Sequence, residues 1–123
     1  MQKQLDGSPA AMRLDVARAV EMMGSEDALR SILDTVVISM SADVPAIDSA
    51  LQTGDILQAN RMLHAIKGYM PIFGTDALIE QVAAVEQLSK TQTAVALQAP
   101  YQQLQVELQS LLSDMRDYLN AAP

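Results

Sequence analysis

The chain contains no cysteine and no tryptophan, and its 123 residues include a single histidine, His64. Without cysteine it has no disulfide framework and no thiolate metal site, which fits a reducing compartment. A single histidine leaves mainly carboxylates for a transition metal, so we expect neither a metal nor another cofactor in this protein.

Aromatic residues are also scarce, since three tyrosines and one phenylalanine stand against eight methionines, while 50% of the residues are hydrophobic. The core must therefore be aliphatic and filled with methionine, which suits packed helices better than a β-sandwich. A chain of this length buries one core but not two. We expect a single all-α domain.

Positive charge is in short supply, with 8 basic against 15 acidic residues and a net charge of −7. No basic patch is present to neutralise phosphates, which argues against nucleic acid as a partner. No run of residues approaches the ~20 apolar residues that span a bilayer, and the N-terminus lacks the apolar region of a signal peptide. We therefore expect no direct membrane contact and a cytoplasmic location.

Apolar residues recur at spacings of three and four along most of the chain, which is the period of amphipathic helices. With the residues expected at helix starts and stops, this pattern predicts five helices, at about 12–23, 26–53, 55–73, 76–88 and 94–120. Short turns between them favour an up-and-down antiparallel four-helix bundle with an additional short N-terminal helix. We expect residues 11–120 to form this domain and residues 1–10 to be a flexible tail.

Three prolines fall inside the predicted helices. Each removes one backbone hydrogen bond and crowds the preceding turn. We expect a kink or break near Ser41–Val44, before Pro45, and a kinked or shortened helix end at Pro71. Pro100 leaves two starts open for the last helix, near Ala94 with a kink or at Pro100 itself, where proline is tolerated.

His64 lies outside the apolar stripe of its predicted helix. That stripe consists of Ile56, Ala59, Leu63, Ile66, Met70 and Phe73. At about 100° per residue, Lys67 lies roughly 60° to one side of His64 and Gly68 roughly 40° to the other. An imidazole thus stands beside a fixed cation and over a position without a side chain, which suits a histidine that must be reached by another protein.

The face around His64 is short of negative charge, because no carboxylate occurs in residues 56–75. We interpret this as a surface cleared for a phosphoryl dianion. Asn60, Arg61 and Pro71 fall on or beside the same face and are expected near a partner's interface.

A glycine inside a helix reduces helix stability by about 1 kcal/mol relative to alanine, so Gly68 is expected to have a specific role. It either leaves room for a partner's backbone to approach the imidazole or admits the first helix, and the sequence leaves both open. Lys67 beside His64 supplies the positive charge on which phosphoryl transfer depends. A neutral imidazole offers a nitrogen lone pair as the nucleophile.

The run Leu63-His64-Ala65-Ile66-Lys67-Gly68, followed by Gly74 and Leu78, resembles the signature of histidine-containing phosphotransfer (HPt) domains. That signature is His-x-x-Lys-Gly with a later glycine near the helix end. The resemblance extends to the preceding stretch 49–55, and residues 14–120 fit the register. It implies a four-helix bundle made by the second to fifth helices, with the first laid across one end.

The resemblance further implies a phosphorelay intermediate that accepts a phosphoryl group on His64 from one receiver-domain aspartate and passes it to another response regulator. Lys67 would stabilise the phosphoryl charge and Gly68 would give clearance, while the partner receiver supplies Mg²⁺. The chain has no Walker loop, H-E-x-x-H motif or paired nucleophile, so we expect a carrier rather than an independent enzyme. It fits either a stand-alone protein or part of a hybrid sensor kinase.

Two alternatives remain open at this point. A similar His-x-Ile-Lys-Gly run occurs in the phosphoacceptor domain of chemotaxis-type histidine kinases, which takes its phosphoryl group from ATP through a kinase domain. From another class, the chain fits a non-phosphorylated helical interaction module. The chain also departs from the HPt pattern at Tyr69-Met70-Pro71-Ile72, where many members have serine and alanine.

Overall fold

The computed structural model describes residues 13–121 and folds them into five helices, with no strand in that range. The helices are α1 (Val16–Met23), α2 (Glu26–Gln52), α3 (Ile56–Phe73), α4 (Asp76–Leu88) and α5 (Ala94–Asn120). The all-α prediction is therefore confirmed. The tail predicted for residues 1–10 lies outside the described residues.

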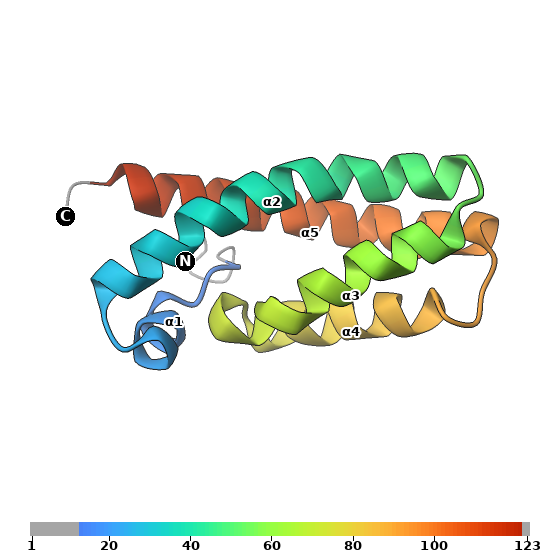
Figure 1. The fold of residues 1–123 in the computed structure, drawn as a ribbon. Helices are drawn as coiled ribbons and strands as arrows, with labels where there is room; N and C mark the ends of the chain where they lie inside the picture. Colours follow the sequence, from blue (N-terminus) through green and yellow to red (C-terminus); the bar gives the residue numbers. More distant parts are fainter. Residues whose placement is uncertain (1–12, 122–123) are drawn as a thin grey trace, which may run out of the picture.

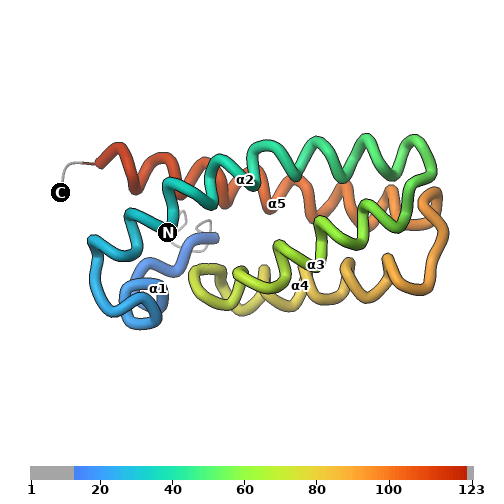
Figure 2. Tube along the Cα trace, viewed as in Figure 1, coloured from blue at the N-terminus to red at the C-terminus, as the bar shows by residue number. Residues whose placement is uncertain are grey.

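Helices α2 to α5 run antiparallel to their neighbours, and α1 lies across one end of them (Figure 1). Helix α2 packs along α5 and helix α3 packs along α4, while α1 touches both α2 and α3. The α2–α3 turn and the α4–α5 turn meet at the end of the bundle opposite α1, as the trace in Figure 2 also shows. This arrangement is the expected four-helix bundle with an extra N-terminal helix.

The core is aliphatic and contains methionine, as the composition predicts. In α3 the inward stripe is fully buried at Ala59, Leu63, Ile66, Met70 and Phe73. Tyr101 is also fully buried, and its hydroxyl donates a 2.6 Å hydrogen bond to the Val44 carbonyl across the α2–α5 contact. No helix within residues 13–121 combines the length and the apolarity needed to cross a bilayer.

Helix starts follow the local sequence closely, because each helix has a side-chain cap at its N-terminus. Each capping oxygen accepts a hydrogen bond from the backbone N–H three residues later, which satisfies one of the free donors of the first turn. The caps are Asp15, Ser25, Asp55, Thr75 and Thr93. Gly24 and Gly54 make the turns after α1 and α2 with positive φ angles of 93° and 82°.

Of the kink or break expected before Pro45 the break is absent, and of the kinked or shortened end expected at Pro71 the shortening is absent. Helix α2 continues through Pro45 without a break, and α3 runs past Pro71 to Phe73 rather than ending early. Helix α5 begins at Ala94, which excludes a start at Pro100. A proline removes only one hydrogen bond, whereas the buried stripe continues on both sides of it and holds the segment helical.

The first helix starts later than expected, at Val16 rather than near Met12. Leu14 instead forms an isolated antiparallel β-bridge with Gly74, in the turn between α3 and α4. Two backbone hydrogen bonds, of 2.7 and 3.1 Å, flank this bridge, and the Leu14 side chain is buried. The extended contact at Leu14 takes the place of a helical turn there, so α1 begins only after Asp15.

Candidate functional site

His64 lies on the outward side of α3, opposite the buried stripe, and 70% of its side chain is exposed. The helix fixes its Cα, since Leu63 and Ile66 of the same turn are buried in the core. The only histidine of the chain is therefore presented to solvent from a rigid element, as expected.

A carboxylate stands against the imidazole, which corrects the expectation of a surface cleared of negative charge. Glu86 of α4 is fully buried, and its Oε2 lies 3.5 Å from Nδ1 of His64. Helix α3 itself carries no carboxylate, but the packing of α4 beside it brings this one into the site. The prediction considered the charges of one helix only, whereas the surroundings of His64 are formed by α3 and α4 together.

Three further groups surround the buried carboxylate. Lys67 Nζ lies 3.3 Å from Oε1, Lys90 Nζ lies 3.4 Å from Oε2, and Asn60 Nδ2 donates to Oε2 at 3.2 Å. We call the set Asn60, His64, Lys67, Glu86 and Lys90 the Glu86 cluster. It contains two ammonium groups against one carboxylate, so its net charge is positive while the imidazole is neutral.

The ionised form of Glu86 is the favoured one. Burial of this carboxyl favours its protonated form, whereas hydrogen bonds from Lys67, Lys90 and Asn60 favour the carboxylate. The hydrogen bonds together prevail, and the pKa of Glu86 is lowered from its usual value. A fixed negative charge is thus held behind the imidazole.

The carboxylate is anchored to the end of α4 through Ser89. The Asn60 amide donates to Ser89 Oγ at 2.6 Å, and the Ser89 hydroxyl donates to the carbonyl of Glu86. These bonds tie α3 to the start of the α4–α5 turn. They position Glu86 and Lys90 relative to the helix that carries His64.

The other predicted site residues divide between the cluster and the open surface. Asn60 and Lys67 belong to the Glu86 cluster, whereas Arg61 and Pro71 are exposed. Gly68 is exposed too, and a Cβ atom built on it would meet nothing within 4 Å. None of the helices within residues 13–121 therefore packs against Gly68, and the alternative that it admits α1 is wrong.

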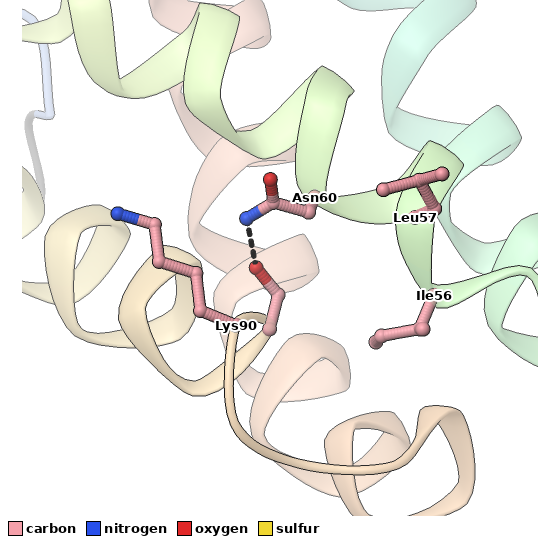
Figure 3. Close-up of a pocket in the computed structure, with 5 residues that line it drawn as sticks. Ile56, Leu57, Asn60 and Lys90 are labelled. Carbon is pink, nitrogen blue, oxygen red and sulfur yellow. Dashed lines mark hydrogen bonds between the residues drawn. The ribbon is translucent and has the colours of Figure 1, made fainter.

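Next to the cluster lies a pocket of about 300 Å³, which we call the Leu57 pocket. It is lined by Ile56, Leu57, Asn60, Ser89 and Lys90. In Figure 3, Ile56 and Leu57 stand on one side of Asn60 and Lys90 on the other, with the Asn60–Ser89 hydrogen bond drawn as a dashed line. Apolar and cationic groups thus border the same opening.

Sequence reasoning did not single out Glu86, Ser89 or Lys90. Glu86 did carry a signal, since it follows Val82 by four residues and thus sits within the apolar side of α4. A carboxylate in such a position requires partners. Which partners it has depends on how α3 packs along α4, and that register is not readable from one sequence.

The arrangement around His64 can support nucleophilic chemistry at the imidazole. Within residues 13–121 no group of three or more His, Cys, Asp or Glu side chains is placed to hold a metal ion. A carboxylate beside Nδ1 favours a proton on that nitrogen, which leaves the lone pair on Nε2. An exposed Nε2 with cations nearby suits attack on an anionic phosphoryl group.

The structure is thus an antiparallel four-helix bundle that presents one histidine, His64, on an exposed helix face. The family model of the Hpt domain matches residues 31–121, and the chain belongs to that family. Hpt domains are phosphoryl carriers of phosphorelays and interact with receiver domains. A search of curated proteins and a search of solved structures each found no match.

Proposed function

We propose that His64 accepts a phosphoryl group at Nε2 from the aspartyl phosphate of one receiver domain and passes it to the aspartate of another. The observation that carries this proposal is the contact between His64 Nδ1 and the buried Glu86 carboxylate. It supports a ring that keeps its proton on Nδ1 and offers the lone pair of Nε2 to a partner.

The transfer balances without a proton leaving the ring. The P–Nε2 bond forms while the bond between phosphorus and the aspartate oxygen breaks, and that oxygen keeps the electron pair. The imidazole then carries a positive charge, with its proton still on Nδ1. Glu86 lies at 3.5 Å to balance that charge, and the reverse transfer returns the ring to its neutral form.

Lys67 and Gly68 have supporting roles in this proposal. The Lys67 side chain is 41% exposed, so its ammonium group is open to a phosphoryl oxygen while it remains near Glu86. Gly68 leaves open space beside the imidazole, which a partner's backbone requires. Arg61, Asn60 and Pro71 border the face that a receiver would cover.

The experiment is to incubate the 123-residue chain with receiver domains labelled by acetyl phosphate. We expect label on the chain that is lost in acid and retained in base, as a phosphoramidate bond requires, and none on His64→Gln. Label that survives acid, or that persists in His64→Gln, would contradict the proposal. Labelling only by a chemotaxis-type kinase with ATP would favour that second kind of phosphoacceptor domain, and no label from either source would favour a non-phosphorylated module.

A further inference from the structure

The contact between His64 and Glu86 is looser than a normal hydrogen bond. At 3.5 Å it exceeds the range of about 2.7–3.2 Å typical of N–H···O bonds. The geometry gives the reason, because three donors converge on the same oxygen. Oε2 of Glu86 is shared by His64, Lys90 and Asn60, whereas Lys67 lies against Oε1.

Lys90 connects this shared oxygen to the Leu57 pocket. Its ammonium group lies 3.4 Å from Oε2, while its side chain is 46% exposed and lines the pocket. A partner that covers the pocket therefore also covers Lys90, whose ammonium group lies on the side of Asn60 away from Ile56 and Leu57 (Figure 3). If the ammonium group moved away from Glu86, His64 would share Oε2 with Asn60 alone.

The pocket also has an apolar wall that is exposed to solvent. Leu57 is 63% exposed, and Ile56 stands beside it. Leu57 precedes His64 by seven residues, two helical turns, and so lies on the same face of α3. A partner that reaches His64 along this face also covers the pocket.

We propose that the Leu57 pocket is a docking site for the receiver domain, which places an aliphatic side chain against Leu57 and an acidic side chain against Lys90. The acidic side chain draws the Lys90 ammonium group away from Glu86. The distance between Oε2 and Nδ1 of His64 then shortens, and the imidazole is held in one orientation for transfer. Docking is thereby coupled to the orientation of the nucleophile. This inference rests on the proposed function and names a contact of that same site.

Charge complementarity favours an acidic receiver surface as the occupant. Arg61, Lys67 and Lys90 surround His64, and α3 carries no carboxylate. The carboxylate of the cluster is fully buried and presents no surface to a partner. The exposed charge at this face is therefore positive, in a protein whose net charge is −7.

The docking part is tested by transfer from the labelled receiver that reacts fastest with the wild-type chain. Leu57→Ser and Lys90→Met should each raise the KM for that receiver on the order of tenfold. Labelling by phosphoramidate, a small donor that needs no docking, gives the reference rate for each variant. Ile38→Ser, which removes a 73% exposed aliphatic side chain that does not line the pocket, is the matched control and should keep the wild-type KM.

The coupling part is tested by the ¹⁵N chemical shifts of the His64 imidazole, which report how the proton is distributed between the two nitrogens. Lys90→Met should shift the neutral ring toward the form protonated on Nδ1. Lys67→Met removes the same charge from Glu86 but from the other oxygen, and should shift it less. Lys90→Arg should restore both the wild-type spectrum and the KM.

Each outcome bears on the inference. An unchanged KM in Leu57→Ser and Lys90→Met, with a wild-type chain that accepts phosphate, would overturn the docking site and leave the proposed function intact. Equal ¹⁵N shifts in the two lysine variants would overturn the competition for Oε2. Failure of every receiver to label the wild-type chain would overturn the proposed function, and this inference with it.

Discussion

At the scale of single residues, two glycines of the signature run occupy opposite environments. A Cβ atom on Gly68 would meet nothing within 4 Å, whereas one on Gly74 would lie 2.8 Å from Met70 Sδ and 3.1 Å from the Met70 carbonyl oxygen. Neither glycine of the pair has a positive φ angle, so neither is required for its own backbone conformation. Gly74 is required by packing, while Gly68 lies on open surface.

We expect Gly68→Gln to raise the free energy of unfolding by about 0.5–1 kcal/mol, because glutamine favours the helix and meets no neighbour. The same variant should transfer phosphate from a receiver more slowly than the wild type. Gly74→Ala should instead destabilise the fold by about 1–3 kcal/mol through its clash with Met70. Urea unfolding and transfer kinetics check both, and a destabilised Gly68→Gln would argue against clearance for a partner.

Glu86 gives a prediction about pH. Because its pKa in the folded state is lowered below the usual 4.5, the carboxylate stabilises the fold above that pH, and this contribution is lost as the pH falls through the folded-state pKa. Glu86→Gln should therefore cost about 1–3 kcal/mol of unfolding free energy near neutral pH. The difference from wild type should shrink below pH 4.5.

Unfolding by urea across a pH series measures this difference. Glu80→Gln, at an exposed position of the same helix, is the control and should stay near wild type throughout. If the difference in unfolding free energy between Glu86→Gln and wild type grew in acid, the ionised carboxylate would not be the stabilising form.

At the scale of the helices, prolines occur inside three of the four long elements without ending any of them. Pro45 is exposed and lies far from the Glu86 cluster in sequence. We expect Pro45→Ala to raise the free energy of unfolding by about 2 kcal/mol, since the missing hydrogen bond outweighs the extra freedom of the unfolded chain. Thermal and urea unfolding would show this, and a lower midpoint would mean that the proline is needed for the packing of α2.

The helices were predictable because their signals are local. Apolar spacing, capping residues and two turn glycines placed α2, α3 and α4 and the end of α5 within a residue or two of their observed bounds, whereas Pro100 left two starts open for α5. The exposed His64 followed from the same spacing. The partners of Glu86 were not predictable, because they depend on how two helices pack. The late start of α1 was not predictable either, because it depends on the pairing of Leu14 with Gly74, sixty residues away.

At the scale of the whole molecule, the residues before α2 close one end of the bundle. The Hpt model matches only residues 31–121, yet Leu14 and Ala19 of this N-terminal segment belong to the same buried core. Arg18 donates to the Gly74 carbonyl at 2.8 Å and pairs with Asp76 at 2.6 Å, so the contact with the α3–α4 turn is polar as well as apolar. The N-terminal segment thus supports the end of the helix that carries His64.

We expect Leu14→Ala to lower the free energy of unfolding by about 2–4 kcal/mol, as for other buried leucines. Val95→Ala, at a 75% exposed aliphatic position, should change it by less than about 0.5 kcal/mol. Hydrogen exchange should also accelerate at the amides of Asp15 and Thr75, which donate in the backbone hydrogen bonds beside the bridge. Unaltered exchange at both amides would mean that the bridge holds without the leucine side chain.

The carboxylate behind Nδ1 has a consequence for the thermodynamics of the relay. In the proposed reaction the ring holds the same proton when it is empty and when it is loaded, since Glu86 faces that nitrogen throughout. Loading and unloading then exchange no proton between the ring and the solvent. For an empty ring that is neutral beside an ionised Glu86, the acidity of the surroundings therefore favours neither direction of transfer at this nitrogen, and the relative abundance of loaded and empty receivers drives the flow of phosphate.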